Sequence, residues 1–244
     1  MELVATRSHF DYHSPAAVGD LHQWIAEAGL ELSSVHAPVA ERLTGGRWEG
    51  PLTLASPDRD VRDRALAEVE RALHIARRIP FRVLVLHLGL LRPAENSRDA
   101  ARRSIDALHD LADPLGVTLA LEVIANELSR PGSLTHFVEE ALERPGVGIC
   151  LDFGHAHLES ELVDDIETVS EHLVAIDLHD NQGRNDDHLV PFEGSIDWPG
   201  PLTAVQKVGY DGTWLFETAG RGPAKETLRR LRSARERMER LLSH

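Results

Sequence analysis

Seven short runs of apolar residues recur along the chain, and each is followed by a polar loop and then by a stretch with helical periodicity. The runs are rich in Val, Ile and Leu and show little polar alternation, which is typical of strands buried on both faces. We predict strands at Glu2–Ala5, Leu32–Val35, Val83–Leu86, Thr118–Leu121, Val147–Leu151, Leu173–Leu178 and Thr213–Phe216.

The stretches between these runs predict helices, several of them closed by a glycine such as Gly29, Gly116 or Gly209. The predicted helices are Pro15–Ala28, Asp58–Arg78, Ser97–Leu115, Ser133–Leu142, Leu162–Glu171, Trp198–Val208 and Pro223–Leu242. The last is amphipathic, and we expect it to pack on the body of the protein rather than on a neighbour. Alternating strands and helices indicate a parallel sheet with right-handed crossovers.

This pattern predicts an α/β protein, a (β/α)8 TIM barrel, in a single domain spanning residues 1–244. The 244 residues suit one barrel of about 250, and no linker or break in composition divides them. A closed barrel has eight strands, and the chain opens inside a strand with no βα unit before it. We therefore expect the chain to lack the first β-strand and helix, with an open seven-stranded sheet as the alternative.

Six consecutive predicted strands end in a residue type that binds metal ions. His36, His87, Glu122, Asp152, His179 and Glu217 each follow an apolar run directly or within one residue. The C-terminal ends of parallel strands meet at one mouth of a barrel, so these six side chains are expected to converge. Ionisable groups at the rim of an apolar core are costly unless they are paired or bound to an ion.

Two loop motifs add three donors. In Asp152-Phe-Gly-His155, a second imidazole follows the strand end, and we expect Gly154 to allow a tight turn. In Asp186-Asp-His188, a carboxylate and an imidazole share one side of an extended segment. A lone histidine after a strand is usually structural, but six such strand ends in a row indicate a shared metal site. Mixed carboxylate and imidazole donors suit zinc, manganese or a similar divalent ion.

Composition narrows the classes of partner. The formal net charge of −14 disfavours nonspecific binding to nucleic acid or to an anionic membrane, and no apolar run reaches the roughly 20 residues of a membrane helix. The N-terminus lacks the apolar stretch of a signal peptide. With Cys150 as the only cysteine, no intrachain disulfide can form, which suits a cytoplasmic location.

The motifs SVHAP, LVLHLG, LALEV, CLDFGHAH, IDLHDN, DDHLVPFEGSIDW and WLFET together resemble the xylose isomerase-like TIM barrel superfamily, and the resemblance covers the whole chain. That superfamily includes sugar and sugar-phosphate isomerases, ketose 3-epimerases and the zinc endonucleases that cut at abasic sites in DNA. Family members begin one βα unit earlier, and Met1-Glu2-Leu3 matches their second strand. A degenerate or truncated barrel that binds metal without turnover is therefore one hypothesis.

For the isomerase and epimerase members, the resemblance implies one divalent ion held by Glu122, Asp152, His179 and Glu217, with Mn, Zn, Co or Mg as the metal. Glu122 and Glu217 would act as general acid and base on an enediolate stabilised by the metal. His155, His188 and Arg184 would bind the substrate, a small sugar or sugar phosphate. The sequence leaves open whether the protein forms a homo-oligomer.

For the endonuclease members, the resemblance implies up to three zinc ions, and all nine of their ligand positions are matched here. The sets are His36, His87 and Glu122 for one ion, Glu122, Asp152, His179 and Glu217 for another, and His155, Asp186 and His188 for the third. A metal-dependent dehydratase on the same barrel is the third function that the resemblance leaves open.

Three features count against DNA cleavage. Val39 stands where the endonucleases carry an aromatic residue that intrudes on DNA, the chain is acidic with few aromatic residues, and its loops are short except at residues 39–57. The sequence therefore favours a sugar isomerase or epimerase over a trinuclear phosphodiesterase.

Overall fold

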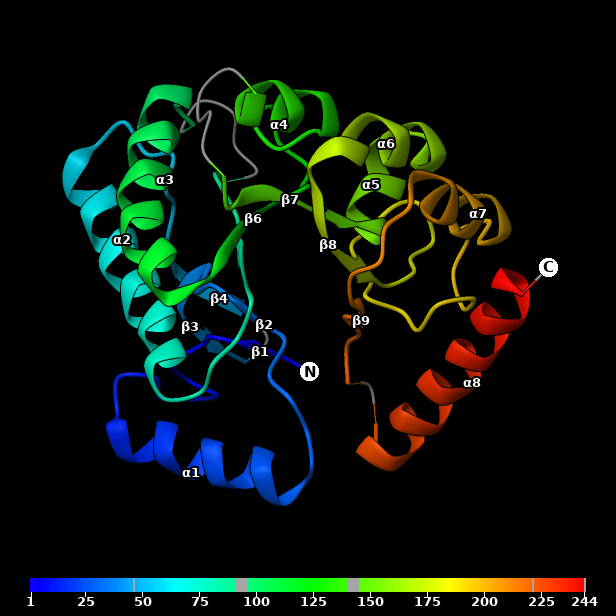
Figure 1. The fold of residues 1–244 in the computed structure, drawn as a ribbon, viewed down its shortest axis with the longest axis horizontal. Helices are drawn as coiled ribbons and strands as arrows, with labels where there is room; N and C mark the ends of the chain where they lie inside the picture. Colours follow the sequence, from blue (N-terminus) through cyan, green and yellow to red (C-terminus); the bar gives the residue numbers. More distant parts are fainter. Residues whose placement is uncertain (46, 91–95, 140–144, 221, 244) are drawn as a thin grey trace.

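Seven parallel strands form one sheet in the computed structural model, which describes residues 1–45, 47–90, 96–139, 145–220 and 222–243. The strands are paired in the order β1-β2-β5-β6-β7-β8-β9, and the sheet curls into a nearly closed barrel surrounded by helices (Figure 1). Their bounds are Glu2–Val4 (β1), Ser34–His36 (β2), Val83–Leu86 (β5), Thr118–Glu122 (β6), Val147–Asp152 (β7), Leu173–Leu178 (β8) and Trp214–Phe216 (β9). All seven predicted strands are confirmed, as is the α/β barrel fold.

The helices follow the predicted order, with polar caps at several N-termini. Ser14 accepts a hydrogen bond from the backbone N–H of Ala17, and Ser97 accepts one from Ala100. The helices are Pro15–Glu27 (α1), Arg59–Leu73 (α2), Arg98–Ala112 (α3), Pro131–Phe137 (α4), Phe153–Glu159 (α5), Leu162–Val169 (α6), Pro199–Val208 (α7) and Ala224–Leu242 (α8). The predicted end of the fourth helix, Leu142, lies outside the described residues.

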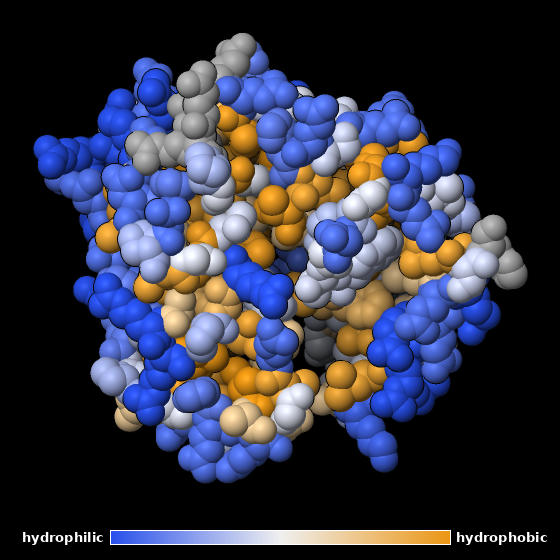
Figure 2. Space-filling model, in the orientation of Figure 1, coloured by the Kyte–Doolittle hydropathy of each residue, from blue (hydrophilic) through white to orange (hydrophobic). Residues whose placement is uncertain are grey.

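The last helix packs against the barrel's outer layer, as predicted. Ala234 and Met238 on α8 are buried, and Gln206 on α7 donates a hydrogen bond to the carbonyl of Leu242 at 2.9 Å. Figure 2 shows hydrophilic side chains over the outer helices and hydrophobic ones gathered toward the middle of the face. None of the helices in the described ranges is long and apolar enough to cross a membrane.

The barrel interior explains why the strand ends carry chemistry. Val85, Ala120 and Cys150 form a small buried apolar cluster, separate from the large core between the sheet and the helices. Side chains on a strand alternate between its two faces, so the residues two positions further along point the same way. Those residues are His87, Glu122 and Asp152.

Two elements differ from the sequence analysis. The long loop expected at residues 39–57 contains an antiparallel hairpin, Ala40–Thr44 (β3) and Arg47–Pro51 (β4). The hairpin is mostly exposed, so it lacks the buried apolar run by which the other strands were predicted. A short helix, α5, begins directly after β7, where the Asp152 side chain accepts a hydrogen bond from the backbone N–H of His155.

Candidate metal centre

Glu122 joins two histidines at one side of the barrel mouth. Its Oε2 atom lies 2.9 Å from Nε2 of His36 and 2.8 Å from Nε2 of His87. His36 ends β2, and His87 directly follows β5, the strand that pairs with β2 on one side and with the Glu122 strand β6 on the other. These three residues form one group whose ligand atoms lie within 4.8 Å of one another.

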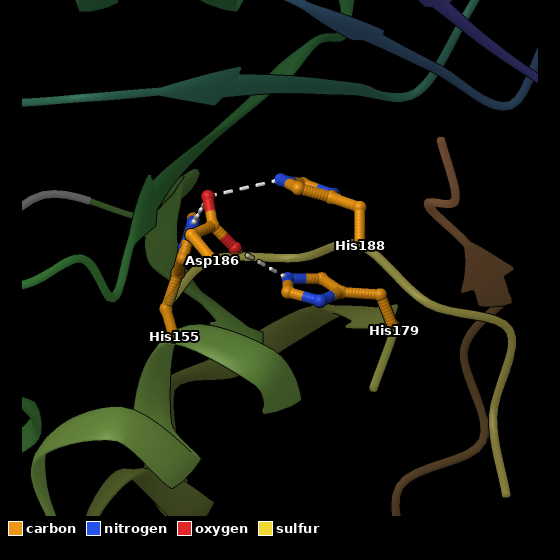
Figure 3. Close-up of side chains that lie close together, drawn as sticks. All are labelled: His155, His179, Asp186 and His188. Atoms are coloured by element: carbon orange, nitrogen blue, oxygen red, sulfur yellow. Dashed lines mark hydrogen bonds and ion pairs between the residues drawn. The ribbon is translucent and has the colours of Figure 1, made fainter. Parts of the chain in front are cut away.

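A second group gathers His155, His179, Asp186 and His188 (Figure 3). The carboxylate of Asp186 lies between the rings, with Oδ2 at 3.3 Å from Nε2 of His155 and 3.0 Å from Nε2 of His188. Its Oδ1 lies 3.5 Å from Nε2 of His179. The rings of His179 and His188 are stacked, with their centroids 4.0 Å apart.

Backbone carbonyls orient these imidazoles. Nδ1 of His36 lies 2.9 Å from the carbonyl of Ala37, and Nδ1 of His188 lies 3.2 Å from that of Glu217. A carbonyl oxygen can only accept, so each Nδ1 carries a proton, and Nε2 faces the carboxylates of the centre. Metal-binding histidines are commonly held in this way, because the hydrogen bond fixes both the tautomer and the ring orientation.

Gly154 was expected to allow a tight turn, but it lies within α5, where a close approach requires glycine. A Cβ atom at this position would lie 1.8 Å from Cε1 of His179. The buried His179 ring therefore packs directly on the backbone of α5, next to Asp152, whose Oδ1 lies 2.9 Å from Nε2 of His179.

Asp180 fixes the segment that carries Asp186 and His188. Its Oδ2 accepts hydrogen bonds from the indole of Trp198 at 2.9 Å and from the backbone N–H of Phe192 at 3.0 Å. Its Oδ1 accepts from the N–H groups of Asn181 and Ile196. Asp180 is fully buried, and these four hydrogen bonds stabilise its carboxylate. They also hold the beginning of the segment, at Asn181, close to its end, at Ile196.

A third group is made of carboxylates alone: Glu122, Asp152, Asp177 and Glu217. Asp177 was missed by the sequence analysis because it falls inside the apolar run of β8. It lies two residues before His179, and this spacing on a strand is the signal that places both on the interior face. Glu2, the first residue of β1, was also missed, because only the residue that follows each run was considered; both of its carboxylate oxygens are buried.

All nine predicted donors belong to groups that are linked to one another because they share residues. A further group of Glu122, Asp152 and His155 links the histidine-rich groups to the carboxylate group. His179 groups with His155, Asp186 and His188, while Glu122 and Glu217 group with Asp152 and Asp177.

Charge is balanced where imidazoles face carboxylates. Burial alone would raise the pKa of Glu122, but His87, His155 and His36 hold that pKa well below its usual range. Burial likewise opposes the protonated form of His36, yet the hydrogen bond and charge of Glu122 raise its pKa well above the usual value.

Negative charge is in excess where the carboxylates crowd together. Burial raises the pKa of Asp177 well above its usual value, and the charges of Glu2 and Glu122 raise it further. Burial, together with Glu122 and Asp152, raises the pKa of Glu217. Burial raises the pKa of Glu2 to about 7.

These residues fit a divalent cation. Among the described residues, Oδ2 of Asp152 and Oε2 of Glu217 are buried without a hydrogen bond. Such atoms are costly to bury unless an ion binds them. The carboxylate group suits oxygen-preferring Mn²⁺ or Mg²⁺, and the histidine-rich groups suit Zn²⁺ or Co²⁺.

A cavity of about 920 Å³ opens onto this centre. His87, His155 and Asp186 line it, so the metal-binding groups are accessible from the cavity. Arg184, the predicted substrate-binding residue outside the metal ligands, also lies on its wall.

The parallel barrel, with ionisable groups at the C-terminal ends of its strands, places the protein in the class of (β/α) barrels. The chain belongs to the xylose isomerase-like TIM barrel family, whose model matches residues 1–240. A relative from Sinorhizobium fredii, an uncharacterised protein, is 28% identical over 218 residues, which are 80% of this chain and 68% of the relative.

Two solved structures share the fold. A D-tagatose 3-epimerase-like protein superposes with a TM-score of 0.81 at 22% identity, covering 99% of this chain and 87% of its own. A D-psicose 3-epimerase superposes with a TM-score of 0.76 at 17% identity, covering 100% of this chain and 89% of its own. At these identities the likeness establishes the architecture.

Proposed function

We propose that this protein is a divalent-metal-dependent isomerase or epimerase of a small sugar. The observation that carries the proposal is that Glu122, which is buried, and Glu217, which is half-buried, lie in one carboxylate group with Asp152. Glu122 ends β6 and Glu217 follows β9, and two strands separate them in the sheet. The two carboxylates therefore reach the centre from different directions, as an acid and a base acting on opposite faces of one carbon would need to.

Glu122, Asp152, His179 and Glu217 would hold one ion, which would supply Lewis acidity toward the carbonyl and adjacent hydroxyl of the sugar. One glutamate would remove the proton from the carbon next to the carbonyl, and the other would return a proton to give the epimer or isomer. Asp152 and His179 would keep the glutamates in place. His155, His188 and Arg184 would bind substrate hydroxyls.

The sugar epimerases that share this fold support the proposal. We also propose that the protein is a cytoplasmic enzyme of one domain, in keeping with a single cysteine, Cys150, that is buried and free.

A trinuclear zinc phosphodiesterase is the second candidate, because the nine donors lie in linked groups that offer more than one ion a place. A metal-dependent dehydratase would use the same carboxylates and then expel a hydroxyl group.

Metal content and proton exchange test the proposal together. We would measure the metal content of protein purified without chelator by elemental analysis. We would then load the protein with Mn²⁺ or Co²⁺ and incubate it with D-fructose, D-psicose or D-tagatose in deuterated water. About one ion per chain, and deuterium at the carbon next to the carbonyl by NMR, are expected.

About three zinc ions per chain, together with nicking of a duplex that contains an abasic site, would overturn the proposal in favour of the phosphodiesterase. Loss of a hydroxyl group from the sugar would instead indicate the dehydratase.

A further inference from the structure

The cavity above the metal centre has a polar side and an apolar side. His87, His155 and Asp186 supply the polar side and belong to the metal-binding groups. The apolar side is built by side chains from three separate segments that follow β2, β5 and β6, and by α5. These side chains are Val39, Trp48, Pro51, Leu90, Ile124 and Leu158.

The cavity is large for a single monosaccharide. Sites that enclose drug-sized ligands measure about 300–1,000 Å³, and 920 Å³ lies near the upper end of that range. A sugar whose reacting carbon lies at the metal centre would fill only the polar end. The apolar wall would then face water, whereas an apolar group bound against it would remove both apolar surfaces from water.

Trp48 is the most exposed large apolar side chain on this wall. It lies on β4, whose residues are all exposed, and its relative exposure of 52% shows that the indole is not part of the core. An indole stacks readily on a flat apolar ring and loses little conformational entropy when it does so. The hairpin thus places an aromatic surface at the apolar end of the cavity.

The charges on the wall do not favour a phosphate at that end. Among the described lining residues, Arg184 is the one arginine or lysine, and it is accompanied by the acidic Asp186 and Glu159. Phosphate sites usually combine several charge-assisted donors. An uncharged extension of the sugar fits this wall better than a charged one.

We infer that the substrate is a keto-glycoside, a glycoside whose sugar ring carries a carbonyl group, with an apolar, aryl-like aglycone. The carbonyl and the hydroxyl beside it lie at the metal centre, and the aglycone packs on Trp48. The sugar end rests on the proposed function, and the aglycone end rests on the cavity alone.

The test compares phenyl β-D-glucopyranoside with methyl β-D-glucopyranoside, a pair that differs only in the aglycone. Both are titrated into the Mn²⁺-loaded protein by calorimetry. The phenyl glycoside is expected to bind at least tenfold more tightly, and Trp48→Ala is expected to remove this advantage. Trp24→Ala is the matched control, because Trp24 is an exposed tryptophan on α1 that does not line the cavity.

Equal affinities for the two probes would overturn the inference, as would an advantage that survives in Trp48→Ala. Trp48→Phe keeps an aromatic ring and is expected to retain most of the advantage, which separates stacking from a general disturbance of the hairpin. If the phenyl glycoside binds through Trp48 but no ketose exchanges deuterium, the proposed function fails and the inference about the aglycone stands. If ketoses exchange but the two probes bind equally, the reverse holds.

Discussion

The two sides of the metal centre are built in different ways. On the carboxylate side, Glu122 and Asp152 are the last residues of their strands and Asp177 lies within a third, and all three are almost completely buried. On the imidazole side, Asp186 and His188 come from a segment without helix or regular strand, and their side chains are 42% and 26% exposed.

On the proposed function, this difference would give the carboxylate side and the imidazole side different roles. The register of paired strands fixes the carboxylates rigidly, which suits groups that must transfer protons at a defined atom. The imidazole side depends on the hydrogen bonds that Asp180 accepts and on a close contact at Gly154. Changes on the carboxylate side should therefore remove the chemistry, while changes on the imidazole side should weaken metal binding and folding.

Removing one carboxylate charge should have the largest effect. Glu217→Gln keeps the size of the side chain but cannot accept a proton. We expect deuterium exchange into the ketose to slow by about 10²–10⁴-fold, the usual contribution of a general acid or base. The rate is measured by NMR at a metal content verified by elemental analysis.

Glu226→Gln is the control for this prediction, because Glu226 is an exposed glutamate on α8 paired with Arg229. An unchanged exchange rate in Glu217→Gln at full metal content would show that the carboxylate side does not carry out the proton transfer.

Crowding the ring of His179 should have the next largest effect. In Gly154→Ala, the new methyl group would lie 1.8 Å from the ring, so His179 or α5 must move. We expect the free energy of unfolding of the metal-free protein to fall by about 1–3 kcal/mol, as for other overpacked cores. Urea unfolding followed by circular dichroism measures this change.

Gly132→Ala provides the matched comparison on α4, since a Cβ atom there would meet nothing within 4 Å. It should leave stability unchanged or raise it. Equal effects of the two substitutions would mean that the packing of His179 on α5 does not restrain the site.

Loosening the loop that carries Asp186 and His188 should weaken metal binding on the imidazole side more than on the carboxylate side. Asp180→Asn removes the charge that accepts four hydrogen bonds from the segment carrying His188. We expect Zn²⁺ affinity to fall by about 10–100-fold, as for other residues that orient metal ligands, and Mn²⁺ affinity at the carboxylate side to change far less. Competition with a chelating dye measures both affinities.

Asp165→Asn controls for loss of a buried aspartate, because Asp165 on α6 is paired with Ser160 away from the centre. Parallel losses of Zn²⁺ and Mn²⁺ affinity in Asp180→Asn would show that the two sides are not independent.

The same contrast explains how far the sequence could predict the site. Glu122 directly follows Leu121 on a buried strand, and the alternation of side chains then leaves one direction for its carboxylate. The positions on the carboxylate side follow from such strand ends. Asp177, which lies inside an apolar run, and Glu2, which begins one, were missed because only the residue that follows each run was considered.

On the imidazole side, the resemblance grouped His155, Asp186 and His188, and the structure adds His179 to this group. Nothing local in Asp186-Asp-His188 indicates that Asp186 will lie between His155 and His188, because the path of the segment depends on Asp180 reaching Trp198. The hairpin β3–β4 was missed for another reason. Its strands are exposed, and no buried apolar face marks them in the sequence.

The response to pH should be the smallest effect, and it tests the imidazole side alone. Burial lowers the pKa of His188, but the hydrogen bond and charge of Asp186 outweigh it and raise the pKa to about 9, above the ordinary 6.5. Because the folded-state pKa is raised, the stabilisation from His188 is complete below about pH 6.5 and is lost as the pH rises toward 9.

We expect the difference in unfolding free energy between the metal-free protein and its His188→Gln variant to shrink across this range. With Zn²⁺ bound, the ring must be neutral to ligate, so the same difference should grow as the pH rises. Urea unfolding at pH 6, 7.5 and 9, with and without Zn²⁺, measures both slopes. Slopes of the same sign would mean that His188 pairs with Asp186 but does not bind the metal.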